Sequence, residues 1–165
     1  MNAPTANATV EDRHFEDFVP GLVSEFGPIA IDEAGIVAFA RHYDPQPIHI
    51  DRAAAAAGPF GGLIASGWHT VSLVMRVLVE NYLARGAALA SPGVDELRWL
   101  QPVRPGDVLR VRVTVLEARR SRSKPDRGLV RTRIETVNQD DAVVMSMVAM
   151  NLFLCRAPEA EAEAG

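Results

Sequence analysis

The hydrophobic pattern of this chain changes once from helical to strand-like, near Pro92, and this change limits the folds that the chain can adopt. Residues 66–85 carry apolar side chains around most of a helical circumference, which is typical of a buried helix. Four segments that follow alternate in polarity or are apolar on both faces, as strands are; they are residues 94–100, 108–117, 129–137 and 143–154. Because an apolar sheet face must be covered, the sequence predicts an α+β fold in which a curved antiparallel β-sheet wraps around one long central helix.

Shorter elements are expected before the long helix: a strand at residues 29–31, a helix from Asp32 to near Tyr43, and a helix over residues 52–57. Asp32 and Asp51 can each begin a helix, because an aspartate side chain accepts hydrogen bonds from the free N–H groups of the first turn. Asp44 and Gln46 both precede prolines, and a residue before proline is displaced from the helical conformation. Residues 44–47 are therefore predicted to be stiff and extended.

The composition is that of an ordinary globular protein. A chain of 165 residues suffices for one domain with a core, expected at residues 14–156, between a flexible N-terminus (1–13) and a disordered acidic tail (157–165). The formal net charge of −4 argues against a nucleic-acid partner, because a phosphate-binding surface needs concentrated positive charge. The one cysteine, Cys155, excludes an intrachain disulfide. No segment resembles a signal peptide or a membrane span, so a cytoplasmic protein without membrane contact is expected.

Residues 43–51 hold the densest group of reactive side chains. Two prolines reduce the freedom of this segment before folding, so that less entropy is lost when Asp44 is fixed relative to His49. A carboxylate and an imidazole held together can share a water molecule, and the imidazole can exchange a proton near neutral pH.

The residues alone leave three interpretations of this pair open. Asp44 and His49 could satisfy backbone groups, could act as a metal-free acid/base pair, or could bind a metal. The candidate ligands for a metal site are Asp44, His49, Asp51 and either His42 or His69. The metal site is disfavoured, because the helical spacing of metalloprotease histidines and ligating cysteines are both missing.

The same segment resembles the signature of MaoC-like dehydratases and (R)-specific enoyl-CoA hydratases, which reads Asp, any residue, Asn, Pro, an aliphatic residue, His, any residue, Asp. Five residues match in register: Asp44, Pro47, Ile48, His49 and Asp51. Gln46 stands at the position of the Asn. Residues 60–70 resemble the loop of that family into its central helix, with Ser66 where many members have His, and residues 100–107 resemble its strand and turn.

This resemblance implies a hot-dog fold and a lyase that reversibly hydrates a 2-enoyl thioester, such as an enoyl-CoA, to a 3-hydroxyacyl thioester. Asp44 and His49 would be the catalytic acid/base pair, with no metal and no cofactor beyond the coenzyme A of the substrate. The backbone N–H of Gly67 would face the thioester oxygen, since a helix N-terminus stabilises negative charge. Ser66 could cap that helix or add a side-chain contact. The candidates for the substrate pocket are Gln46, Leu63, Ile64 and Trp68.

Hot-dog proteins of this type imply a homodimer or higher homo-oligomer, and residues 143–154, apolar on both faces, are consistent with burial beyond one sheet face. Two other functions stay open: a non-catalytic subunit that binds an acyl thioester, and a hot-dog thioesterase. Residues 118–124 form a basic turn, expected to be a solvated hairpin loop or a contact for coenzyme A phosphates. Trp99 is expected in the core or at a subunit interface.

Overall fold

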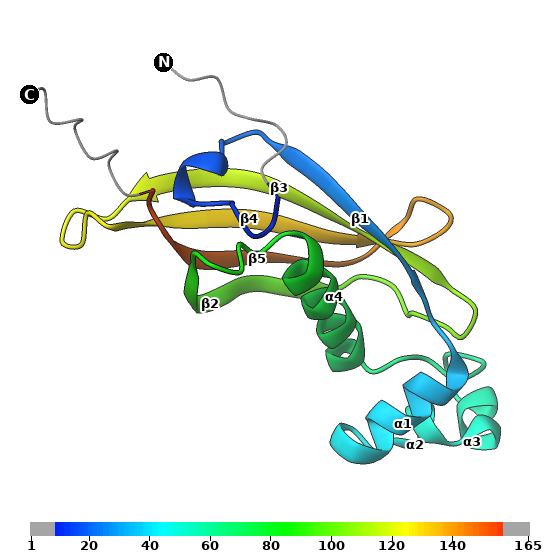
Figure 1. Ribbon diagram of the computed structural model, residues 1–165. Helices are drawn as coiled ribbons and strands as arrows, with labels where there is room; N and C mark the ends of the chain where they lie inside the picture. The colour runs from blue at the N-terminus through cyan, green and yellow to red at the C-terminus, as the bar shows by residue number, and fades with distance from the viewer. Residues whose placement is uncertain (1–8, 157–165) are drawn as a thin grey trace, which may run out of the picture.

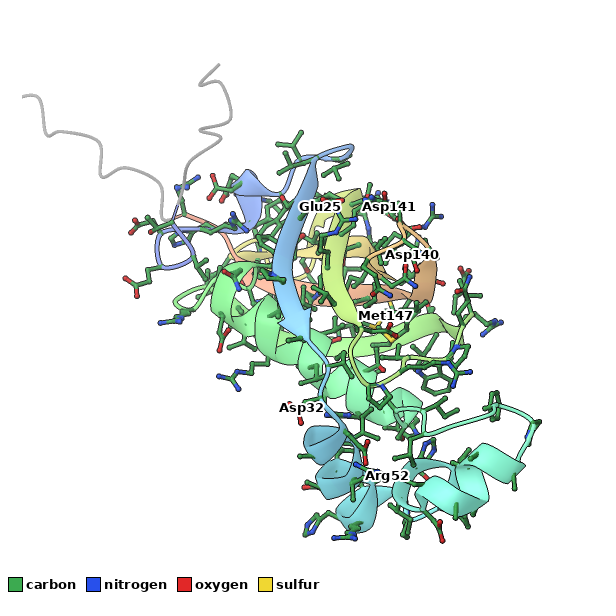
Figure 2. The ribbon with its side chains drawn as sticks, turned by 90° about the vertical axis from the view of Figure 1, so that its right-hand side faces the viewer. Glu25, Asp32, Arg52, Asp140, Asp141 and Met147 are labelled. Carbon is green, nitrogen blue, oxygen red and sulfur yellow. The ribbon has the colours of Figure 1, made fainter. Side chains whose placement is uncertain are left out.

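The computed structural model describes residues 9–156. Five antiparallel strands form one sheet in the spatial order β1-β3-β4-β5-β2 (Figure 1). The strands are β1 Val23–Ala30, β2 Ala88–Trp99, β3 Val108–Arg120, β4 Arg127–Val137 and β5 Val143–Leu154. The helices are the 3-10 helix η1 Phe15–Asp17, and α1 Glu33–Tyr43, α2 Pro47–Ile50, α3 Arg52–Ala57 and α4 Gly67–Asn81. Helix α4 lies along one face of the sheet in both views (Figures 1 and 2), which confirms the predicted α+β architecture.

Helix α4 packs on the sheet through one face only. Val74 and Leu78 belong to the core, together with inward-facing residues of β3, β4 and β5. Trp68 and Met75, on the other face, are 57% and 46% exposed. The expectation of a helix buried on all sides is therefore wrong for residues 9–156 of the single chain, because the sheet covers one side of α4 and no other described element covers the opposite side.

The predicted helix over residues 66–85 is also too long at its C-terminal end. Helix α4 ends at Asn81, where the N–H groups of both Tyr82 and Leu83 donate to the Leu78 carbonyl. Tyr82 then turns into the core, where its ring meets Phe18 edge to face at 5.5 Å. The apolar residues after Asn81 continue the helical spacing in the sequence, which is why the predicted helix was too long. In the structure the chain turns after Asn81, and Tyr82 is buried outside the helix.

The central strands follow the alternation in the sequence. Val111, Val113 and Val115 of β3 are buried, and the residues between them face outward. Strand β5 has the predicted bounds and lies between β4 and β2. Its position inside the sheet explains why both of its faces are apolar.

The two edge strands are longer than predicted. Strand β1 begins at Val23 rather than Ile29, and its pairing with β3 shifts between Phe26 and Ile29. Strand β2 begins at Ala88 rather than Val94 and includes Pro92, with three shifts in its pairing with β5. An edge strand can accept irregular pairing and a proline because one side makes no ladder hydrogen bonds. Both features obscure the alternation on which the prediction relied.

Helices α1, α2 and α3 form a group beside the N-terminal end of α4 (Figure 1). Asp32 lies where the chain leaves β1 for this group (Figure 2), and its Oδ1 accepts a hydrogen bond of 2.6 Å from the Gly35 N–H. Asp51 accepts from the N–H groups of Ala53 and Ala54 at the start of α3. Both predicted N-caps are confirmed.

The segment between α1 and α3 corrects one prediction. Residues 44–46 are not extended throughout: the Gln46 N–H donates to the Asp44 carbonyl at 2.7 Å, which closes a tight turn at Pro45, and Gln46 itself is extended. Pro47 then begins the four-residue helix α2, which carries His49. Proline suits the first position of a helix, because its fixed φ is helical and its missing N–H would have no partner there. His49 is thus held on a helical turn rather than on an extended loop.

The ends of the chain lie mostly outside the described residues. The acidic tail, 157–165, falls wholly outside them, and the expected flexible N-terminus overlaps them only over residues 9–13. There, the Arg13 guanidinium donates to the Tyr82 carbonyl at 3.0 Å. The domain bounds of 14–156 stay a prediction.

Removal of the N-cap of α1 should destabilise the protein. Asp32→Ala deletes the acceptor for the Gly35 N–H, which should lower the free energy of unfolding by about 1 kcal/mol in urea. Asp140→Ala is the matched control, because no hydrogen bond or ion pair of the Asp140 side chain is found within residues 9–156. Equal stability of the two variants would contradict the assignment.

Candidate active site

A cleft of about 480 Å³ lies where the N-terminal end of α4 meets the α1–α2 segment and the end of β2. Its polar wall includes Asp44, His49 and Ser66. Its apolar wall includes the rings of Phe60, Trp68 and Trp99, with Leu100 and Val144. A concave site with a few convergent polar groups and a mostly apolar lining is typical of a binding site for a small organic molecule.

His49 is buried, with 5% of its surface exposed, and one partner fixes its tautomer. Its Nδ1 lies 2.7 Å from the carbonyl oxygen of Ile64. Because a carbonyl can only accept, Nδ1 carries the hydrogen, and Nε2 of the neutral ring has a free lone pair. Nε2 lies 3.3 Å from Oδ2 of Asp44. The structure therefore brings the predicted pair together.

Both carboxylate oxygens of Asp44 accept hydrogen bonds. Gln46 Nε2 donates to Oδ1 at 2.7 Å, and the Ser66 hydroxyl donates to Oδ2 at 2.7 Å. These two bonds, that of Gln46 first, lower the pKa of Asp44; partial burial opposes them, and the nearby His49 adds to the lowering. Hydrogen bonds to the charged form favour it, so Asp44 is a carboxylate at neutral pH.

Three separate chain segments position this pair. Asp44 follows the last turn of α1, where its N–H donates to the Ala40 carbonyl. The loop before α4 is tied to the α2 segment by the Ile64 N–H, which donates to the Ile48 carbonyl at 3.2 Å. The N–H of Ala65 donates to the Val103 carbonyl at 2.8 Å. These backbone bonds fix the loop that carries both the Ile64 carbonyl, which accepts from His49, and the Ser66 hydroxyl, which donates to Asp44.

Ser66 does not cap α4 with its side chain, so the capping interpretation is wrong. Its hydroxyl instead donates to Asp44, as described above. The side chain is fully buried, and one acceptor occupies the hydroxyl proton. Ser66 therefore belongs to the hydrogen-bond network of the candidate pair.

Gly67 makes room for Trp99. A Cβ atom on Gly67 would lie 2.3 Å from Cε2 of the Trp99 ring, far inside a normal contact. The indole of Trp99 also meets that of Trp68 edge to face, with ring centroids 5.4 Å apart. In this structure the missing side chain of Gly67 thus permits the close approach of Trp99.

Three of the four predicted pocket residues line the cleft: Gln46, Ile64 and Trp68. Leu63 does not; it is buried and borders a separate shallow depression with Arg52 and Arg104. Trp99, expected in the core or at an interface, is half-exposed and lines the cleft. Phe60, Leu100 and Val103 lie in the two segments that resemble the family, but no local pattern marked them as pocket residues, and the fold places them in the lining.

The candidate metal ligands are dispersed. Asp51 caps α3, and His69 stacks on Phe39 with ring centroids 4.9 Å apart, outside the cleft lining. Burial lowers the pKa of His69. Among residues 9–156, no group of three or more His, Cys, Asp and Glu side chains is placed to hold a metal ion.

The basic turn lies at the other end of the sheet. Residues 118–120 are the last residues of β3 rather than part of the turn, and residues 121–124 lead from β3 toward β4, where Gly128 pairs with Phe153. Strand β5 reaches the cleft at its opposite end, through Val144. Arg120 pairs with Glu16, with Nη2 and Oε1 2.9 Å apart. Within one chain this basic segment therefore lies far from the cleft. Its position supports a hairpin loop rather than a contact for coenzyme A phosphates at the cleft of the same chain.

Comparison with known proteins agrees with this architecture. The sequence model of the family described as "MaoC like domain" matches residues 18–139. The chain belongs to the MaoC-like family. The structure of a MaoC-like dehydratase from Rhodospirillum rubrum is 40% identical and superposes with a TM-score of 0.82, covering 88% of this chain and 99% of that one. The fold of this MaoC-like protein is therefore the hot-dog fold expected from the resemblance.

Two further relatives carry functional names. A 3-hydroxybutyryl-CoA dehydratase of Methylorubrum extorquens is 37% identical over 105 residues, which are 63% of this chain and 64% of that enzyme. This MaoC-like chain thus matches just under two thirds of the length of that dehydratase. The unliganded structure of the (R)-hydratase PhaJ1 from Pseudomonas aeruginosa is 26% identical, with a TM-score of 0.67, over 90% of this chain and 95% of that one.

Within residues 9–156, no helix is long and apolar enough to cross a membrane.

The packing of Trp99 on Gly67 can be tested by a double-mutant cycle. Gly67→Ala should lower the free energy of unfolding by about 1–3 kcal/mol in the wild-type background, because the new methyl group overlaps the indole. In a Trp99→Ala background the same change should be neutral or stabilising, because alanine is the better helix former. Chemical denaturation of the four proteins measures the coupling. Additive effects would show that Trp99 does not occupy this space.

Proposed function

We propose that this protein catalyses the reversible hydration of a 2-enoyl thioester, such as an enoyl-CoA, to the 3-hydroxyacyl thioester, with Asp44 and His49 as the acid/base pair. The observation that carries the proposal is the 3.3 Å approach of His49 Nε2 to Asp44 Oδ2 in a cleft, with the other imidazole nitrogen committed to a carbonyl. Membership in the MaoC-like family and the names of its dehydratase and hydratase relatives support the reaction class.

The geometry suits a bound water molecule. The free lone pair of neutral His49 and the carboxylate of Asp44 are both acceptors. They lie 3.3 Å apart, so a water molecule fits beside them, on the cleft side, and can donate one hydrogen to each. Its oxygen lone pair is then directed away from the pair, toward a substrate in the cleft. Water is in this way both oriented and polarised without a further cofactor in the proposed mechanism.

The proposed reaction balances through His49. The water oxygen bonds to C3 of the enoyl group, one water proton passes to Nε2, and the C2=C3 π electrons move to the thioester oxygen as an enolate. The imidazolium then returns a proton to C2, and the thioester carbonyl re-forms. Asp44 stays ionised and stabilises the imidazolium during the step. The reverse sequence is the dehydration.

The enolate oxygen needs donors, and the start of α4 supplies one in this proposal. The Gly67 N–H finds no hydrogen-bond acceptor among residues 9–156, and it lies at the positive end of a fifteen-residue helix that borders the cleft. Gly67 is therefore proposed as the oxyanion donor, with the Trp99 ring beside it as one wall of the thioester site.

Activity of two variants tests the role of the pair. Asp44→Asn and His49→Ala should each lower kcat by at least about 100-fold, because proton transfer and orientation of the water are lost. The assay follows loss of absorbance of the conjugated enoyl thioester when the protein is mixed with crotonyl-CoA and with longer and branched substrates. Asp140→Asn and His14→Ala, both outside the cleft lining, are the matched controls.

The same assay separates the alternative functions. Release of free coenzyme A thiol, detected with a thiol reagent, would indicate a thioesterase, because hydration releases none. Saturable binding of an acyl-CoA without turnover, unaffected by His49→Ala, would indicate a non-catalytic binding subunit. Retained hydration in both Asp44→Asn and His49→Ala would reject the proposed roles of these residues.

We also propose that the protein forms a homodimer through the β2 edge. Val94 and Leu100, on or next to this strand, are 50% and 55% exposed, and the uncovered face of α4 carries the further exposed apolar residues Trp68, Met75 and Val79. An unpaired edge strand with apolar side chains favours pairing with another chain. The dimer would bury the apolar surface that the single chain leaves open beside the cleft.

The two sheet edges offer a matched pair for this proposal. Val94→Asp, on β2, should shift the protein from dimer to monomer in sedimentation-velocity experiments, because it would bury a charge in the interface. Val23→Asp, on β1, changes a valine of similar exposure, 53%, at the opposite edge and should leave the dimer intact. A monomeric wild type, or loss of the dimer only in Val23→Asp, would reject the assignment of the edge.

A further inference from the structure

Gln46 forms three hydrogen bonds to the two residues of the candidate pair. Its side-chain Nε2 donates to Asp44 Oδ1 at 2.7 Å. Its backbone N–H donates to the Asp44 carbonyl, also at 2.7 Å, and its own carbonyl accepts from the His49 N–H at 2.9 Å. One residue between Asp44 and His49 is thus bonded to both of them.

We propose that Gln46 is a positioning residue that joins Asp44 and His49 into one rigid unit and holds the Asp44 carboxylate in the orientation that the reaction requires. This inference rests on the proposed hydration. It reassigns Gln46 from a contact of the substrate pocket to a support of the reacting groups, although its side chain borders the cleft.

The backbone around Gln46 makes this support stiff. Gln46 lies between Pro45 and Pro47, and its φ of −79° and ψ of 142° lie in the extended region that a following proline favours. Gln46 is also the N-cap residue of α2, so its carbonyl accepts the first hydrogen bond of the turn that carries His49. A displacement of Gln46 therefore moves both members of the pair.

The side-chain amide has a separate effect on the carboxylate. With Gln46 on Oδ1 and Ser66 on Oδ2, the carboxylate cannot rotate without the loss of a hydrogen bond, and Oδ2 stays directed at His49. Only a donor can serve at the Gln46 position, because Oδ1 of an ionised carboxylate can only accept. A glutamate of the same length would place a second carboxylate within hydrogen-bond distance of the first, and the two would compete for one proton.

Titration of Asp44 provides a readout that does not depend on turnover. Asp44 is observed by its ¹³Cγ chemical shift in protein labelled at aspartate, with the signal assigned by its loss in Asp44→Asn. In Gln46→Ala the titration should move to higher pH, because a hydrogen bond to the charged form is lost. In Gln46→Glu, which keeps the length and the shape, the shift should be larger.

Kinetics distinguishes positioning from substrate contact. Gln46→Ala and Gln46→Glu should lower kcat by roughly tenfold or more with little change in KM, whereas loss of a substrate contact would raise KM. Gln46→Asn keeps the amide on a shorter arm and should recover part of both the kcat and the Asp44 titration. Folding is checked by the thermal midpoint, and Gln46→Glu serves if Gln46→Ala is unstable.

Gln101→Glu is the charge control. Gln101 also lines the cleft, but within residues 9–156 it makes no side-chain hydrogen bond to Asp44, so a glutamate there should shift the Asp44 titration less than Gln46→Glu does. An unchanged Asp44 titration in Gln46→Ala, an equal shift in Gln101→Glu, or a rise in KM alone would overturn the proposal. Absence of turnover in the wild type together with a shifted titration would reject the hydration, while the hold of Gln46 on Asp44 would stand.

Discussion

The packing of α4 against the inner face of the sheet is the contact on which the rest of this structure depends. Val74 and Leu78 close the core against buried valines of β3 and β4, and the burial of such side chains stabilises by about 1.5–3 kcal/mol each. The same contact fixes the start of α4, where Ser66 and Gly67 lie. The site therefore takes its position from the core.

A second constraint acts on the short segment between α1 and α3. Prolines on both sides of Gln46 limit the backbone, and α2 turns His49 back toward Asp44. The loop before α4 then supplies the Ile64 carbonyl to one ring nitrogen and the Ser66 hydroxyl to the carboxylate. Nδ1 of His49 and both oxygens of Asp44 thus have defined partners, which is the preorganisation that the proposed acid/base reaction needs.

The exposed apolar side chains of the single chain include a group on one side of the molecule, next to the cleft. The free face of α4 and the β2 edge expose large apolar side chains next to the cleft, whereas the face toward the sheet is closed. Trp99 belongs to both regions, since it ends β2 and lines the cleft against Gly67. In a dimer along this edge, assembly and the shape of the substrate site would depend on the same residues.

Several features of this fold and site were predictable from local sequence. The alternation of Val111, Val113 and Val115, the caps at Asp32 and Asp51, and the spacing of Asp44 and His49 depend on neighbours within a few residues. The resemblance to the MaoC-like signature predicted the hot-dog fold and the position at which the central helix begins. Irregular pairing at the sheet edges obscured the full lengths of β1 and β2.

The sequence by itself determined the order of helices and strands and the segment that carries the candidate pair, because periodicity, caps and prolines act over short distances along the chain. Only the tertiary structure decided that Ser66 bonds to Asp44 across 22 residues, that Trp99 rather than open space lies against Gly67, and that one face of α4 stays uncovered. These contacts join segments that meet only when the sheet closes on α4, and no local pattern specifies which side chains then face each other.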